Sequence, residues 1–139
     1  MRFPRFDEVM VGDELPVVEK PPLSRATLAL FADASADRNP VHIDIDAARA
    51  AGLPDVVGHG MLTMAYLGQV LTGWVRQSAI RSYSARFVAP TRLGDALTCT
   101  ARVAEKRPAG AQSTVRLELK VVDQFGEVKV LGEAEVQFG

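Results

Sequence analysis

Two side chains that can exchange protons lie close together in the segment 37–42, which reads DRNPVH. Asp37 carries a carboxyl group, and His42, five residues later, carries an imidazole, which readily gains and loses protons at neutral pH. Pro40 pushes the preceding residue toward extended backbone geometry, which disfavours a continuous helix. We therefore expect a loop that presents both groups, and the pair indicates general acid–base chemistry.

A third group for such chemistry is predicted at Gly60, eighteen residues after the histidine. This glycine opens the long apolar segment 60–75, for which we expect a helix. The first N–H groups of a helix have no partner within it, so they can stabilise a negative charge that develops during a reaction. An acid, a base and an oxyanion donor are therefore all available.

Each of these residues also has a structural interpretation when it is taken alone. An Asp-x-Asn-Pro sequence forms a turn in which Asp37 or Asn39 bonds to the local backbone. A lone histidine such as His42 is more often structural than catalytic. The second histidine, His59, either forms a hydrogen bond at the helix start or contributes to the site. The joint occurrence of the pair and Gly60 favours catalysis, with Asn39 in a supporting role.

Taken together, the motifs resemble those of the MaoC-like dehydratases, which include R-specific enoyl-CoA hydratases and (3R)-hydroxyacyl-ACP dehydratases. The resemblance rests on Asp-x-Asn-Pro-x-His at 37–42, GLPD at 52–55 and HGMLTM at 59–64. It is closest to the catalytic subunit of the mycobacterial hydroxyacyl-ACP dehydratases, and it covers most of the chain. Gly58 departs from the pattern, because Ala or Val is expected before the His-Gly pair.

The resemblance implies a hydro-lyase that interconverts (3R)-hydroxyacyl and trans-2-enoyl thioesters by removing or adding water. In such an enzyme Asp37 and His42 hold the water, and the amide of Gly60 binds the thioester carbonyl. The substrate is then an acyl-CoA or an acyl carrier protein thioester. Which catalytic side chain delivers the α-proton stays open, because close groups titrate together. The oxyanion and substrate-binding surroundings comprise Asn39, His59 and Met61.

Other functions compete with this interpretation. A hotdog thioesterase usually needs an acidic residue on its central helix, and the segment 60–75 has no Asp or Glu. An acyl-thioester-binding subunit of a heterodimeric dehydratase would not need the retained acid–base pair. A zinc site requires three or four converging ligands, which two histidines and scattered acids do not provide. We therefore expect no metal. The sequence also has no glycine-rich phosphate loop, so we expect no cofactor.

The composition suits one domain over residues 1–139, with 47% hydrophobic and 24% charged residues. A net charge of -1 gives no basic field for nucleic acid. The single cysteine, Cys99, excludes an internal disulfide, and we expect it in the core. Residues 1–8 lack the apolar core of a signal peptide, and the stretch 60–71 is shorter than the ~20 residues that cross a bilayer. A cytoplasmic protein without a membrane partner is expected.

Three helices are predicted. Ser24 is placed to cap a helix that runs to about Ser35. Asp46 is placed to cap a short helix over 47–51, which Gly52 ends. Apolar residues surround most of the circumference of the third helix, 60–75, so we expect it to be enclosed with only a thin polar seam.

The second half of the chain alternates between apolar and polar residues, which indicates strands with one buried face. Turn sequences rich in Gly and Pro separate the strands. With 14–18 as a fifth strand, the chain predicts an α+β hotdog fold, in which a five-stranded antiparallel sheet wraps around the long central helix. The four alternating runs are 82–87, 97–103, 115–121 and 128–138.

The edge strands of such a sheet leave backbone groups unpaired, so a dimer is expected. In hotdog proteins that resemble this chain, the neighbouring subunit closes the acyl pocket. We favour a homodimer, with a heterodimer that includes a related hotdog subunit as the alternative. Four arginines either meet the phosphates of the substrate carrier or form a solvated strand face, the interpretation we favour: Arg76, Arg81, Arg86 and Arg92.

Overall fold

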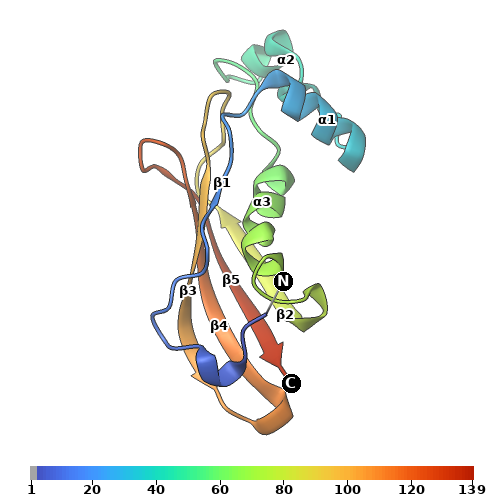
Figure 1. Ribbon diagram of the computed structural model, residues 1–139. Coiled ribbons are helices and arrows are strands. Elements are labelled where there is room, and N and C mark those ends of the chain that lie inside the picture. The colour runs from blue at the N-terminus through green and yellow to red at the C-terminus, as the bar shows by residue number, and fades with distance from the viewer. Residues whose placement is uncertain (1–2) are drawn as a thin grey trace.

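The structure is a computed structural model that describes residues 3–139. One long helix, α3 (Gly60–Thr72), packs against a five-stranded antiparallel sheet in the order β1-β3-β4-β5-β2. In Figure 1 the sheet curves around α3, and the two shorter helices lie together at one end of the molecule. The predicted arrangement of sheet and helix is therefore confirmed. The other elements are α1 (Arg25–Ser35), α2 (Ile45–Ala50), β1 (Val18–Glu19), β2 (Ile80–Phe87), β3 (Thr98–Arg107), β4 (Ser113–Val122) and β5 (Val128–Phe138).

The core lies between α3 and the alternating apolar residues of the sheet. On β4, Val115, Leu117 and Val121 have no exposed surface, and Leu67 and Leu71 of α3 are buried equally completely. Burying one such side chain stabilises a fold by roughly 1.5–3 kcal/mol. Cys99 on β3 is also fully buried, as predicted. The most deeply buried residues of the core include Leu28, Leu67, Leu71, Leu97, Val103, Val115, Leu117 and Val136.

The predicted N-cap is correct for one of the two short helices and wrong for the other. The Ser24 side chain accepts a hydrogen bond from the Thr27 amide and caps α1, as expected. The prediction of Asp46 as the cap of α2 is wrong, because Asp44 holds that position. The Asp44 backbone is extended, and its carboxylate accepts from the Asp46 amide at 2.9 Å, which places Asp46 inside the first turn.

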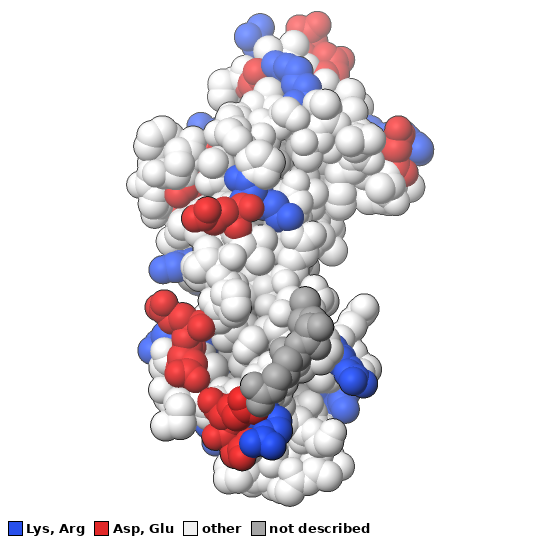
Figure 2. All heavy atoms as spheres, in the orientation of Figure 1, with Lys and Arg blue, Asp and Glu red and all other residues white. Residues whose placement is uncertain are grey.

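The central helix is shorter and less enclosed than predicted. It ends at Thr72 instead of reaching residue 75, because Gly73 forms the C-cap. One face packs on the sheet, whereas the opposite face, which includes Met61, Ala65 and Gln69, is exposed in the single chain. Figure 2 shows few charged side chains on the surface over α3. Enclosure on all sides would therefore require a partner.

The first strand is also shorter than the predicted 14–18. β1 pairs with β3 only at Val18 and Glu19, and Glu14 forms an isolated bridge. Pro16 lies between them and has no N–H to donate, so the ladder is interrupted there.

No helix within residues 3–139 is long and apolar enough to cross a bilayer. The expectation that residues 1–8 are not a signal peptide concerns a segment whose first two residues, Met1 and Arg2, lie outside the described residues.

Candidate active site

The loop after α1 is built by its own side chains. α1 ends at Ala36, whose φ of 62° turns the chain away from the helix axis. The carboxylate of Asp37 accepts from the Asn39 amide at 3.3 Å, and the side chain of Asn39 accepts from the Val41 amide at 3.2 Å. Pro40 then begins a short 3-10 helix, Pro40–His42. The turn interpretation of this sequence is correct, and the same turn presents the acid–base pair.

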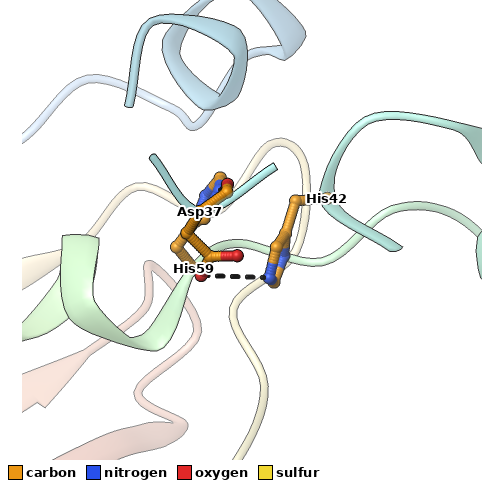
Figure 3. Close-up of side chains that lie close together, drawn as sticks. All are labelled: Asp37, His42 and His59. Atoms are coloured by element: carbon orange, nitrogen blue, oxygen red, sulfur yellow. Dashed lines mark hydrogen bonds and ion pairs between the residues drawn. The ribbon is translucent and has the colours of Figure 1, made fainter. Parts of the chain in front are cut away.

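Asp37 and His42 face each other across a short gap. Their Oδ2 and Nε2 atoms are 4.0 Å apart, and Figure 3 shows the carboxylate directed at the imidazole. This distance is too long for a direct hydrogen bond. A water oxygen placed ~2.8 Å from each of these two atoms would have them at an angle of roughly 90° to each other. One water can therefore form a hydrogen bond to both groups at once. The side chain of His42 is 13% exposed and that of Asp37 is 47% exposed.

A backbone carbonyl determines the tautomer of His42. Nδ1 lies 2.8 Å from the carbonyl oxygen of Val57, which can only accept a hydrogen bond. Nδ1 of His42 must therefore carry the proton. In the neutral ring Nε2 is then unprotonated, and it is the atom that faces Asp37.

His59 is fully buried and packs against this loop. Its Nε2 donates to the backbone carbonyl of Asp37 at 3.0 Å, and its ring stacks on His42 at a centroid distance of 3.9 Å. Phe31 contacts the ring edge-on at 4.9 Å. Among the described residues the Nδ1 atom of His59 has no hydrogen-bond partner. These contacts favour the structural role of His59 over direct substrate contact.

Gly60 is the first residue of α3, as predicted, and His59 caps the helix without a side-chain hydrogen bond. The Gly60 amide therefore has no partner within the helix. This residue lines a pocket of about 280 Å³, whose wall includes Thr63 and the segment 87–91. A side chain at Gly60 would meet the ring of Phe87 at 3.3 Å, so the space beside the amide is narrow.

The structure explains why a glycine occupies position 58. A Cβ atom there would collide with the Oγ1 atom of Thr91, which is buried and occupies that space. Thr91 also accepts the Gly58 amide through its backbone oxygen at 2.8 Å. Sequence patterns do not indicate Thr91 as part of the site, although the unusual glycine is a sign that another residue fills this position.

The remaining predicted residues are distributed as follows. Met61 is 58% exposed at the start of α3. The four arginines do not gather in one pocket: Arg76 and Arg81 line a cavity near Phe138, and Arg86 lines a different one. Arg81 also donates to Gln137 at 2.7 Å.

Potential metal ligands of Asp37, His42 and His59 lie within 4.8 Å of one another. The two imidazole rings are stacked with an interplanar angle of 26°, so their in-plane lone pairs run side by side and do not converge on one point. We therefore keep the expectation that no metal takes part.

A sheet wrapped around a helix, with an Asp–His pair beside the helix start, is the layout of a hotdog protein. The chain belongs to the MaoC-like family, because the model of the MaoC like domain matches residues 8–125. An (R)-specific enoyl-CoA hydratase of Rhodospirillum rubrum is 32% identical over 133 residues, covering 94% of this chain and 89% of that protein.

A mitochondrial 3-hydroxyacyl-[acyl-carrier-protein] dehydratase of Arabidopsis thaliana is 28% identical over 125 residues, covering 89% of this chain and 74% of that protein. Among solved structures, the unliganded R-hydratase PhaJ1 of Pseudomonas aeruginosa matches with a TM-score of 0.83 and 31% identity. That match covers 96% of this chain and 84% of the other. The hotdog fold is thereby confirmed.

Proposed function

We propose that this protein is an R-specific hydro-lyase that interconverts (3R)-hydroxyacyl and trans-2-enoyl thioesters. The observation that carries the proposal is the 4.0 Å gap between Asp37 Oδ2 and His42 Nε2 beside the start of α3. The similarity to an enoyl-CoA hydratase and to a hydroxyacyl-carrier dehydratase supports the same reaction class.

In the hydration direction, the dyad positions and activates the water. An ionised Asp37 and a neutral His42 with a free Nε2 both accept hydrogen bonds. A water that donates one hydrogen to each keeps its lone pairs free to attack C3 of the enoyl thioester. One member of the pair takes the proton of the attacking water.

The thioester end is held by Gly60. As the C3–O bond forms, the C2–C3 double-bond electrons move toward the thioester carbonyl, and the Gly60 amide stabilises the developing enolate oxygen. The dyad then returns the proton to C2, so the reaction consumes one water and releases no net proton. Dehydration follows the same steps in reverse. In this proposal Asn39 shapes the loop, His59 supports it, and Met61 lies at the substrate entrance.

The acyl group is carried by coenzyme A or by an acyl carrier protein, since relatives of both kinds are similar to this chain. No cofactor is needed, because the three groups above account for every proton transferred. We place residues 1–139 in one catalytic unit and retain a cytoplasmic location as a prediction.

Purified protein incubated with crotonyl-CoA tests the proposal directly. Loss of the enoyl-thioester absorbance is expected, and chiral chromatography should show a (3R) product, because a water held between Asp37 and His42 reaches one face of the double bond. A predominantly (3S) product would contradict the proposal. Turnover of the crotonyl carrier-protein thioester, but not of the CoA thioester, would identify an acyl carrier protein as the carrier of the acyl group.

We further propose that the active form is a dimer. β2 pairs with β5 along one edge only, and beside its open edge the apolar side chains of Phe87 and Val88 are each 50% exposed. Met61 on the uncovered face of α3 adds to this surface. A second copy would cover it and enclose the half-exposed Asp37. We favour a homodimer, with a heterodimer that includes a related hotdog chain as the alternative.

A further inference from the structure

A lysine is buried close to the pocket at Gly60. Lys129, near the start of β5, is 2% exposed. Its Nζ atom donates to the carbonyl of Pro90 at 3.0 Å. A buried charge is costly unless several partners surround it. Here the ammonium also faces three carboxylates: Glu127 at 2.6 Å, Asp95 at 3.3 Å and Asp123 at 3.7 Å.

These partners come from two different segments. Asp123 and Glu127 belong to the turn between β4 and β5, whereas Pro90 and Asp95 belong to the loop between β2 and β3. Both segments lie at the end of the sheet that faces α1 and α2 (Figure 1). Burial favours the neutral amine, but the hydrogen bonds to Glu127 and Asp95 outweigh it, so the pKa of Lys129 is raised. The ammonium therefore links the loop to the turn.

The loop 88–95 is fixed to Lys129 at both ends. At its start, the backbone carbonyl of Lys129 accepts two amides, from Val88 at 2.9 Å and from its neighbour at 3.3 Å. Toward its end, the Asp95 carboxylate accepts the Arg92 amide at 2.8 Å. The first residues of this loop form the wall of the pocket next to the Gly60 amide.

The same loop reaches His42 through the backbone. The Thr91 carbonyl accepts the Gly58 amide at 2.8 Å, and Val57 forms a β-bridge with Arg92. The Val57 carbonyl in turn accepts Nδ1–H of His42 at 2.8 Å. A displacement of the loop would therefore move both the pocket wall and the carbonyl that orients the catalytic imidazole.

We infer that Lys129 is a positioning residue for the reaction, because it fixes the loop 88–95, which forms the pocket wall and supports the backbone segment that orients His42. This inference rests on the proposed function. A methionine would fill the volume of the lysine, but it would leave the Pro90 carbonyl and the Asp95 carboxylate without their cation.

Two substitutions separate positioning from simple stabilisation. Asp95→Asn and Glu127→Gln each remove a negative partner of the same ammonium, but only Asp95 belongs to the loop 88–95. Asp95→Asn should lower kcat for crotonyl-CoA hydration by about 10- to 100-fold with a smaller change in KM. Glu127→Gln should lower Tm while kcat stays within about twofold.

Lys129→Met is expected to behave like Asp95→Asn, and Lys120→Met is its matched control. Lys120 lies exposed on β4, and its strand partners, Thr100 and Leu131, lie outside the loop 88–95. All assays are run well below the Tm of each variant, so that unfolding does not contribute. If Lys129→Met does not fold, the comparison of Asp95→Asn with Glu127→Gln still tests the positioning role.

Imidazole nitrogen-15 spectra provide a readout that requires no turnover. The chain has two histidines, so the signals of His42 can be assigned by their loss in His42→Gln. The His42 signals should shift in Asp95→Asn and Lys129→Met, and remain unchanged in Glu127→Gln and Lys120→Met. Unchanged His42 signals and unchanged kcat in Asp95→Asn would overturn the inference. A wild type that is inactive on both crotonyl thioesters, alone and mixed with a related hotdog chain, would overturn the proposed function alone, and the spectra would still test the positioning role.

Discussion

His42 is oriented by a backbone carbonyl and a stacked ring, with no acidic side chain behind it. Its Nδ1–H donates to Val57, and His59 covers one face of the imidazole. The carboxylate of Asp37 faces the other ring nitrogen, Nε2, where the two groups would share the water of the proposed reaction. Each member of the pair therefore needs its own proton-accepting atom for the chemistry.

Removing either proton acceptor should suppress turnover. Asp37→Asn keeps an oxygen for the Asn39 amide, and His42→Gln keeps a polar side chain, so Tm should change little. kcat is expected to fall by ~10²- to 10⁴-fold, the usual cost of losing a general acid or base. Asp33→Asn is the matched control, because Asp33 is exposed and, among residues 3–139, pairs with Arg38 alone. Near-normal turnover in either dyad variant would show that the dyad assignment is wrong.

Gly60 should tolerate no larger residue. The site for a Cβ atom is 3.3 Å from the Phe87 ring, so Gly60→Val would displace that ring or tilt the amide. We expect poor folding or a large rise in KM for crotonyl-CoA, measured together with the circular dichroism spectrum. Gly68→Ala is a control within the same helix, because its Cβ would make an ordinary contact at 3.5 Å with Tyr83. A well-folded Gly60→Val protein with unchanged kinetics would remove Gly60 from the site.

Cys99 should be inert in the native protein. Burial raises the pKa of its thiol to about 11, although Lys20 acts in the opposite direction. Because the folded pKa exceeds the unfolded value, the folded state loses stability as the pH rises above ~9. Iodoacetamide at about pH 8 should label Cys99 only after unfolding. Tm should also fall more between about pH 8 and pH 10.5 in the wild type than in Cys99→Ala, and equal losses would contradict the buried thiol.

At the scale of elements, alternation and caps predicted most of the structure. β3, β4 and β5 follow from their apolar faces, and α1 follows from Ser24. The errors lie where a single backbone group decides the outcome. Pro16 interrupts the predicted first strand, and the extended backbone at Asp44 moves the cap of α2 by two residues. The missing N–H of Pro16 is visible in the sequence, whereas the cap of α2 depends on a dihedral angle that residue type only weakly determines.

The site was only partly predictable for a related reason. Asp37, His42 and Gly60, the residues of the proposed site, stand out in the sequence by their type and spacing. Val57 acts through its carbonyl and Thr91 through the volume that it fills, and neither role leaves a local pattern in the sequence. Only the tertiary pairing of the segments that contain them brings these contacts to the site.

Gly58 and Thr91 should compensate for each other. Gly58→Ala places a methyl group where Thr91 Oγ1 lies, so it should destabilise the protein by ~1–3 kcal/mol. Thr91→Ala removes the obstacle, and the double variant should recover a large part of the loss. Urea unfolding of all four proteins measures the coupling, which should reach at least ~0.5 kcal/mol for residues in contact. Strictly additive effects would show that the two residues do not compete for this space.

At the scale of the whole molecule, the single chain leaves its functional surfaces incomplete. α3 has an apolar composition all round, yet only the face toward the sheet is covered. Asp37 is 47% exposed, although water other than the reacting molecule must be excluded from the site. The edge strand β2 lies beside α3, whose exposed face carries few charged side chains, so one partner can cover both (Figures 1 and 2).

The assembly prediction can be tested by dilution. Light scattering of the purified chain should give the mass of a dimer, and specific activity should fall at concentrations where the dimer dissociates. Phe87→Glu would place charges against each other across a twofold interface, so light scattering should show a shift toward the monomer. Glu135→Lys, a charge change at a partly exposed position on the neighbouring strand β5, serves as a check for general charge effects. Full activity of a monomer at every concentration would refute a pocket completed by a partner. An inactive homodimer that gains activity when mixed with a related hotdog chain would instead identify the heterodimer as the working form.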